Sequence, residues 1–436
     1  MNPPRILFPV LLPAAVLALA AAGGPVAATD FEPPPVLKAS EVLPAAALKG
    51  EHHEVIEEVH NDGYMNRFRI ASDFGRFEAH GAPMLAVRVQ EIGALAELAE
   101  LSKAKVFADS ALTAITSQVT TVREFAERPA ETVKGIGDGL GRMWKRAKRT
   151  AGEVKDDLQE AKKGQEAKKE TGGETGGKQD QAAAAARSYA KKYFGSTAAE
   201  RRWAEKLGVD PYTTNETLRK GIREVARVDA AGGFSVKLAG LPSIPGAGVI
   251  GSVNKLVWGK DPGELKELNT KQLAAMGADK ALIGRFFDNP FFLSPSRQTR
   301  FVSALADLEG VADRAVAVEL AAAVESEEGA LYQLGTAVML GWLHGGEAPL
   351  ARLAPVRVIP AALTADGRLA VAGPMDHTVW TEDLAAAIER LDEIGTRLGA
   401  ERREVWFRGE VSERCRRELE DRGWTVHTRF ARGPGS

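Results

Sequence analysis

The chain has 436 residues, of which 44% are hydrophobic and 27% charged, a balance typical of globular domains. This length exceeds what one ordinary core contains, so we expect two or three domains. The formal net charge of -2 lacks the positive excess needed to bind nucleic-acid phosphates, and the single cysteine, Cys415, excludes an internal disulfide framework. We therefore expect no nucleic-acid partner and a fold held together by packing.

Residues 1–28 have the three parts of a secretory signal peptide. Arg5 provides a positive start, Ile6 to Ala22 is apolar, and Val26-Ala27-Ala28 fits a cleavage site of small residues. A signal anchor is the alternative, although the apolar run is short for a membrane span. No later stretch has the ~20 consecutive apolar residues that a spanning helix requires. We expect export, cleavage near Ala28, a periplasmic or secreted mature chain, and no transmembrane span in it.

Residues 29–128 are expected to form a small antiparallel β meander followed by long helices. Strands are predicted at 53–59, 64–70 and 76–78, because residues alternate in polarity there and glycine-containing turns separate them. Pro83 then begins a helix with an apolar stripe at a period near 3.6. The stripe consists of Leu85, Ile92, Leu95, Leu98 and Leu101. It would cover the apolar face of the meander.

Four histidines also lie in this region. Imidazole is a suitable zinc ligand, but the spacing of these histidines matches no metal motif, so no metal site is expected. They are His52, His53, His60 and His80.

Residues 129–153 form a predicted basic amphipathic helix. Its apolar face contains Val133, Ile136, Leu140, Met143 and Trp144, and its basic residues include Lys145, Arg146, Lys148 and Arg149. Such a helix is typical of segments that lie flat on anionic lipid. The alternative is that the apolar stripe continues a heptad seam and packs on a partner helix, with the basic face in water. Four glycines between 135 and 141 weaken helicity in either case.

Three further regions follow. Residues 154–181 are rich in charge, glutamine and glycine and predict a disordered charged linker. Residues 182–346 predict a helical domain, in which Thr197 with Glu200 forms a capping box and Ser326 begins another helix. Residues 351–432 predict a small ββαβαβ domain, with a hairpin around Asp366-Gly367 and parallel pairing of its last strands.

The C-terminal domain contains the candidate ligand residues. Gly409 and Ser412 lie between a predicted strand and a predicted helix, where backbone N–H groups favour an anion or another ligand. Asp376 and His377 end the hairpin and could face the same rim, where an acid and an imidazole would suit acid–base chemistry. The alternative is structural, with Asp376 in a turn and Ser412 as a helix cap.

The sequence thus predicts a predominantly helical α+β protein that resembles no family of known activity. We find no phosphate loop or nucleophile elbow, and the glycine-rich run at 246–251 lacks the strand that must precede a dinucleotide site, so no cofactor is expected. These observations favour an exported cell-envelope protein without catalysis that binds an envelope protein partner or an anionic membrane surface. The alternative is an enzyme or a small-ligand-binding module built on the C-terminal domain.

Overall fold

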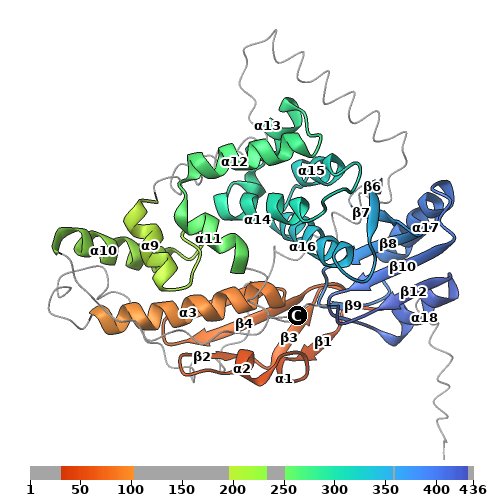
Figure 1. The fold of residues 1–436 in the computed structure, drawn as a ribbon. Coiled ribbons are helices and arrows are strands. Elements are labelled where there is room, and N and C mark those ends of the chain that lie inside the picture. The colour runs from red at the N-terminus through yellow and green to blue at the C-terminus, as the bar shows by residue number, and fades with distance from the viewer. Residues whose placement is uncertain (1–30, 103–195, 233–250, 357–358, 431–436) are drawn as a thin grey trace, which may run out of the picture.

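The computed structural model describes residues 31–102, 196–232, 251–356 and 359–430 (Figure 1). The predicted signal peptide (1–28), basic amphipathic helix (129–153) and charged linker (154–181) lie outside these residues. In the part of the chain that is described, no helix is both long and apolar enough to cross a membrane.

The N-terminal sheet is antiparallel and has five strands. They are β1 (Val36–Lys38), β2 (His53–Val55), β3 (Glu58–Asn61), β4 (Asn66–Ser72) and β5 (Gly75–His80), with short helices α1 (Ala39–Val42) and α2 (Ala45–Leu48) after β1. β4 is central, because β2 and β3 pair with one of its edges and β5 with the other. Gly63 and Gly75 have φ of 101° and 108°, which the predicted tight turns require of glycine. The region predicted as one strand at 53–59 contains two strands, β2 and β3, and strand β1 was not predicted.

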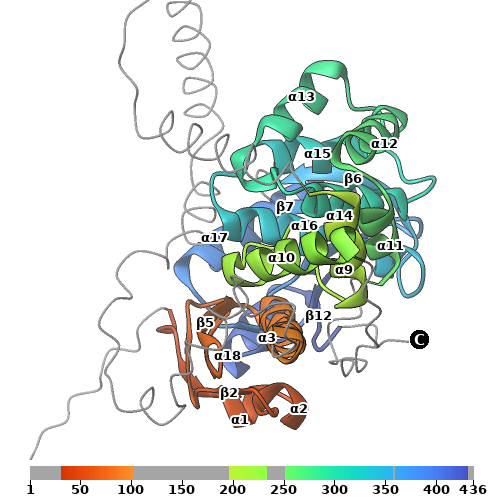
Figure 2. The same ribbon diagram turned by 90° about the vertical axis from the view of Figure 1, so that its left-hand side faces the viewer.

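Helix α3 (Ala82–Ser102) packs against this sheet, as its apolar stripe predicts. All five stripe residues are buried, and they share a core with Phe68 and Ile70 of β4. Helices α9 (Ala198–Lys206) and α10 (Glu216–Gly232) belong to the same core. Figures 1 and 2 show α3 lying between the N-terminal sheet and these two helices.

The remaining helices form a second layer. They are α11 (Gly251–Gly259), α12 (Pro262–Ala275), α13 (Lys280–Asp288), the 3-10 turn Pro290–Phe292, α14 (Pro295–Ala306), α15 (Ala315–Ala322) and α16 (Glu327–His344). Their core contains the mutually packed rings of Phe286, Phe292 and Phe301. The predicted capping box at Thr197 and Glu200 and the predicted cap at Ser326 are both confirmed.

The C-terminal sheet is mixed, with the strand order β12-β10-β8-β7-β6. Its strands are β6 (Leu350–Val356), β7 (Ile359–Thr364), β8 (Arg368–Gly373), β10 (Arg402–Phe407) and β12 (Trp424–His427). β8, β10 and β12 are parallel, as predicted for the last strands. The crossover helices α17 (Glu382–Arg397) and α18 (Glu413–Asp421) pack on one face, and α15 and α16 pack on the other. A short parallel pair, β9 (His377–Thr378) and β11 (Glu410–Val411), extends beyond the sheet.

The predicted fold class is wrong. The described residues form a mixed α/β protein with two five-stranded sheets, not a predominantly helical one that ends in a ββαβαβ domain. One reason is β6, whose sequence Leu-Ala-Arg-Leu-Ala-Pro-Val is rich in alanine and contains a proline, both of which are depleted in strands. β6 lies at the edge of its sheet, where a proline is tolerated.

Candidate functional site

Two of the four predicted ligand residues, Asp376 and His377, lie in a seam, which we define as the contact of residues 61–66 and 82 with residues 376–381. The other two, Gly409 and Ser412, lie beside it. The Asp376 carboxylate lies at its centre and is 5% exposed. It accepts hydrogen bonds from the backbone N–H groups of Asn66 (3.2 Å) and Ala82 (3.1 Å) and pairs with the Arg408 guanidinium at 2.5 Å. This side chain therefore joins both sheets and the start of α3.

Backbone contacts continue the seam. The carbonyl oxygen of Tyr64 accepts from the N–H groups of Asp376 (3.0 Å) and His377 (3.2 Å), and the Gly63 carbonyl accepts from Val379 N at 3.1 Å. The hydroxyl of Tyr64 lies 2.5 Å from that of Thr381, which is the N-cap of α17. Hydrogen bonds of this density fix the two sheets relative to one another.

Gly409 and Ser412 also make structural contacts. A Cβ atom on Gly409 would lie 1.8 Å from the Asp376 carbonyl oxygen, so only glycine fits there. Ser412 is the N-cap of α18: its hydroxyl accepts from Cys415 N at 2.9 Å and donates to Glu32 at 2.6 Å. Burial lowers the pKa of His377, which nearby carboxylates oppose in part, so its imidazole favours the neutral form. The four residues thus lie together, with Asp376 and Ser412 engaged in bonds that hold the fold.

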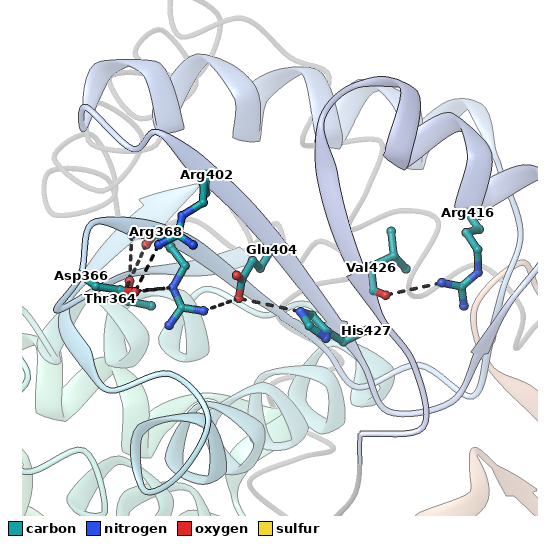
Figure 3. Close-up of polar contacts among 8 residues, drawn as sticks. All are labelled: Thr364, Asp366, Arg368, Arg402, Glu404, Arg416, Val426 and His427. Atoms are coloured by element: carbon teal, nitrogen blue, oxygen red, sulfur yellow. Dashed lines mark hydrogen bonds and ion pairs between the residues drawn. The ribbon is translucent and has the colours of Figure 1, made fainter.

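A second polar group crosses the face of the C-terminal sheet that α15 and α16 cover, where the sequence predicted no site. Arg368, Glu404 and His427 come from the adjacent strands β8, β10 and β12 and form the polar row (Figure 3). Arg368 Nη1 donates to Glu404 Oε2 at 2.8 Å, and His427 Nε2 lies 3.8 Å from the same oxygen. Arg368 Nε also donates to both oxygens of Asp366 at 2.9 Å.

The charges in the polar row are set by these contacts. Hydrogen bonds to Glu404 and then Asp366 raise the pKa of Arg368, which keeps the guanidinium charged. Hydrogen bonds from Thr364 and Arg368 lower the pKa of Asp366. Burial lowers the pKa of His427, and Glu404 opposes this shift. The row therefore combines a fixed ion pair with an imidazole that favours its neutral form.

Aromatic rings adjoin the polar row. The His427 ring stacks on Trp406 with centroids 3.6 Å apart and an interplanar angle of 8°, and Phe430 meets Trp406 edge-on at 4.9 Å. Trp406 Nε1 is buried, and no described residue accepts its hydrogen. A neutral imidazole beside a carboxylate can accept a proton, and a free indole N–H can bind an acceptor atom. Glu404 is the sequence signal that could have revealed the polar row, because a charge inside a parallel strand that is buried on both faces requires a partner.

The only thiol of the chain lies away from this chemistry. Cys415 is fully buried among the residues that α17 and α18 pack on the opposite face of the sheet. Burial raises its pKa to about 12, so the reactive thiolate is strongly disfavoured. Cys415 is therefore an inert core residue.

The N-terminal histidines occupy separate positions. His52 pairs with Asp73 at 2.9 Å, His60 with Glu58 at 2.8 Å, and His80 lies 3.8 Å from Glu328 of α16. His53 is buried, and its Nε2 lies 3.3 Å from the Ala47 carbonyl oxygen. Within the described ranges no three histidine, cysteine or acidic side chains gather as metal ligands would.

Comparison with known proteins gave no match among protein-family models, curated proteins or solved structures. The predicted surface residues from Val133 to Arg149 lie outside the described residues.

Proposed function

We propose that this chain is an exported cell-envelope protein that works without catalysis, by binding an anionic membrane surface or an envelope protein partner through residues 133–149. The observation that carries the proposal is the shared core of α3 and α9, the helices on either side of residues 103–195. This segment leaves the described structure after α3 and returns at α9, and both helices belong to the same buried core. A binding segment attached at both ends to one core can transmit its position to the whole protein.

The anchoring contacts are specific. The side-chain amide of Gln90 in α3 donates to the carbonyl oxygen of Gly208, two residues after α9. Glu91 of α3 is 2% exposed and accepts from the hydroxyl of Thr213 and, at 3.4 Å, from Asn215 Nδ2. A buried carboxylate with several donors is costly to disrupt, because the donors and the charge would all lose their partners. The base of the segment is therefore firmly fixed.

The segment itself has the composition that a lipid surface selects. Its apolar side chains, including Trp144, would enter the boundary of the acyl chains, and each nearby lysine or arginine adds ~1 kcal/mol from the surface potential. Lys145, Arg146, Lys148 and Arg149 thus contribute roughly 4 kcal/mol, about a thousandfold in binding. The structural use of Asp376 and Ser412 further supports a role without catalysis.

Vesicle flotation tests the membrane version of the proposal. The mature chain should float with vesicles containing phosphatidylserine or phosphatidylglycerol and remain in the lower fraction with neutral vesicles. Trp144→Ala with Lys145→Glu and Arg146→Glu should abolish flotation. Lys220→Glu with Lys271→Glu is the control for charge, because both side chains are exposed on helices outside the segment (67% and 70%). Binding that survives the triple substitution, or equal loss in the control, would reject this version.

A protein partner is tested separately. Cross-linking and affinity capture from envelope extract should recover one defined protein with the wild-type chain and lose it with the triple variant. If neither vesicles nor a defined protein depend on residues 133–149, the proposal fails.

The second candidate function is a small-ligand-binding module in the C-terminal region, and the polar row favours it. Its specific observation is the buried Trp406 Nε1 without an acceptor beside Glu404 and His427. A ligand that binds only the folded chain would raise its melting temperature in a thermal-shift screen, and Glu404→Gln should remove the shift. A shift that persists in Glu404→Gln would place the ligand elsewhere.

A further inference from the structure

The first two described residues, Phe31 and Glu32, lie against the C-terminal sheet, although the chain continues from them into β1 of the N-terminal sheet. We call these two residues the strap. One oxygen of the Glu32 carboxylate accepts hydrogen bonds from Trp380 N and from the Ser412 hydroxyl, both at 2.6 Å. The Glu32 N–H donates to the Trp380 carbonyl oxygen at 2.8 Å. Phe31 packs against the core of the C-terminal sheet. A pair of residues thus makes side-chain, backbone and apolar contacts at once.

The strap lies where parallel sheets commonly bind ligands. Trp380 directly precedes the N-cap of α17, and Ser412 is the N-cap of α18, so both follow the carboxyl ends of parallel strands. Ligands of open α/β sheets bind beyond these strand ends, and helix N-termini favour negative charge. The Glu32 carboxylate supplies that charge from within the chain.

The connection to the rest of the chain favours this placement. Residues 33–35 are all prolines, each of which fixes its own φ, so the segment is a stiff spacer that spans roughly 9 Å. Its far end is held because Asn61 N donates to the Pro35 carbonyl oxygen at 3.0 Å, and β1 then pairs with β3. The strap therefore reaches the C-terminal sheet with little freedom to lose.

We infer that the C-terminal sheet carries a recognition site for an extended peptide with an aromatic residue followed by glutamate, and that the strap fills this site within the same chain. In this site the peptide backbone bonds to the backbone of Trp380, and the glutamate carboxylate accepts from Trp380 N and the Ser412 hydroxyl. The aromatic side chain packs on the adjoining core. A partner segment of the same chemistry, including the strap of a second copy, would bind when the internal strap is released.

A peptide in trans tests the inference on the full chain. The strap is disabled by Phe31→Ala with Glu32→Gln, and the probe is a fluorescein-labelled peptide of residues 29–35, Thr-Asp-Phe-Glu-Pro-Pro-Pro. Fluorescence anisotropy should show saturable binding to the disabled chain and at least tenfold weaker binding to the wild-type chain, because the internal strap competes at a high effective concentration. The peptide with glutamine in place of glutamate should bind at least tenfold more weakly. Glu41→Gln, on an exposed glutamate of α1, is the control and should behave as wild type.

The inference is overturned if the disabled chain is folded by circular dichroism and does not bind the peptide, or if disabled and wild-type chains bind it equally. If the double variant does not fold, hydrogen exchange of the single variant Glu32→Gln decides. Exchange should become at least tenfold faster at the amides of Trp380 and Cys415 and remain unchanged within β10. Unchanged exchange at the first two amides would also overturn the inference.

Discussion

Replacing Asp376 tests whether the seam holds the two sheets together. Asp376→Ala removes a carboxylate that is 5% exposed, leaves the 19% exposed Arg408 without its partner, and deprives the N–H groups of Asn66 and Ala82 of an acceptor. Removing one partner of a buried ion pair costs about 3–5 kcal/mol, so we expect a loss of about 4 kcal/mol in the free energy of unfolding. Asp376→Asn keeps one acceptor oxygen and should lose about 2 kcal/mol.

Urea unfolding followed by far- and near-ultraviolet circular dichroism measures this loss. Asp288→Ala is the matched control, because Asp288 is exposed at the end of α13, and its effect should stay within about 0.5 kcal/mol. Arg408→Met with Asp376→Asn should cost less than the sum of the two single changes, since the pair is then removed together. If Asp376→Ala is no more destabilising than Asp288→Ala, the seam does not hold the sheets and the structural account of Asp376 is refuted.

Two further substitutions follow from the structure. Gly409→Ala should destabilise the chain by about 3 kcal/mol in the same urea assay, because its Cβ would meet the Asp376 carbonyl oxygen. The control is Gly284→Ala, in open space within α13, which should be neutral or stabilising by up to ~1 kcal/mol. Equal effects of the two substitutions would contradict the close approach at Gly409. His427→Gln should reduce the fall in melting temperature between pH 7 and pH 5.5. Burial lowers the pKa of His427 below the unfolded value of about 6.5, so the unfolded chain takes up the proton first as the pH falls, and stability is lost there. An unchanged pH profile in His427→Gln would show that His427 does not contribute.

Local signals in the sequence predicted local structure well. The apolar stripe from Leu85 to Leu101 is buried, the capping box at Thr197 forms, and Gly367 occupies the predicted hairpin turn with φ of 81°. Each of these features depends on residues within a few positions of one another, through helical period, side-chain capping or the steric freedom of glycine. Features that depend only on neighbouring residues could therefore be predicted from the sequence.

The fold class and the polar contacts depend on distant residues and were not predictable in this way. β6 is a strand because β7 pairs with it, although its alanines and proline disfavour that state. Asp376 bonds residues about 300 positions away, and no spacing within the sequence indicates this pairing. The polar row was missed for the same reason, since Arg368, Glu404 and His427 are neighbours only through the strand order of the sheet.

The bond from Ser412 to Glu32 joins residues 380 positions apart, so it has a consequence for the order of assembly. A ribosome makes Glu32 380 residues before Ser412, at roughly 5–20 residues per second, which leaves the Glu32 carboxylate without this hydrogen-bond donor for tens of seconds. Contacts of such long range also form late, because closing the loop costs entropy before any bond repays it. A chain that terminates before Ser412 would thus leave Glu32 without this bond.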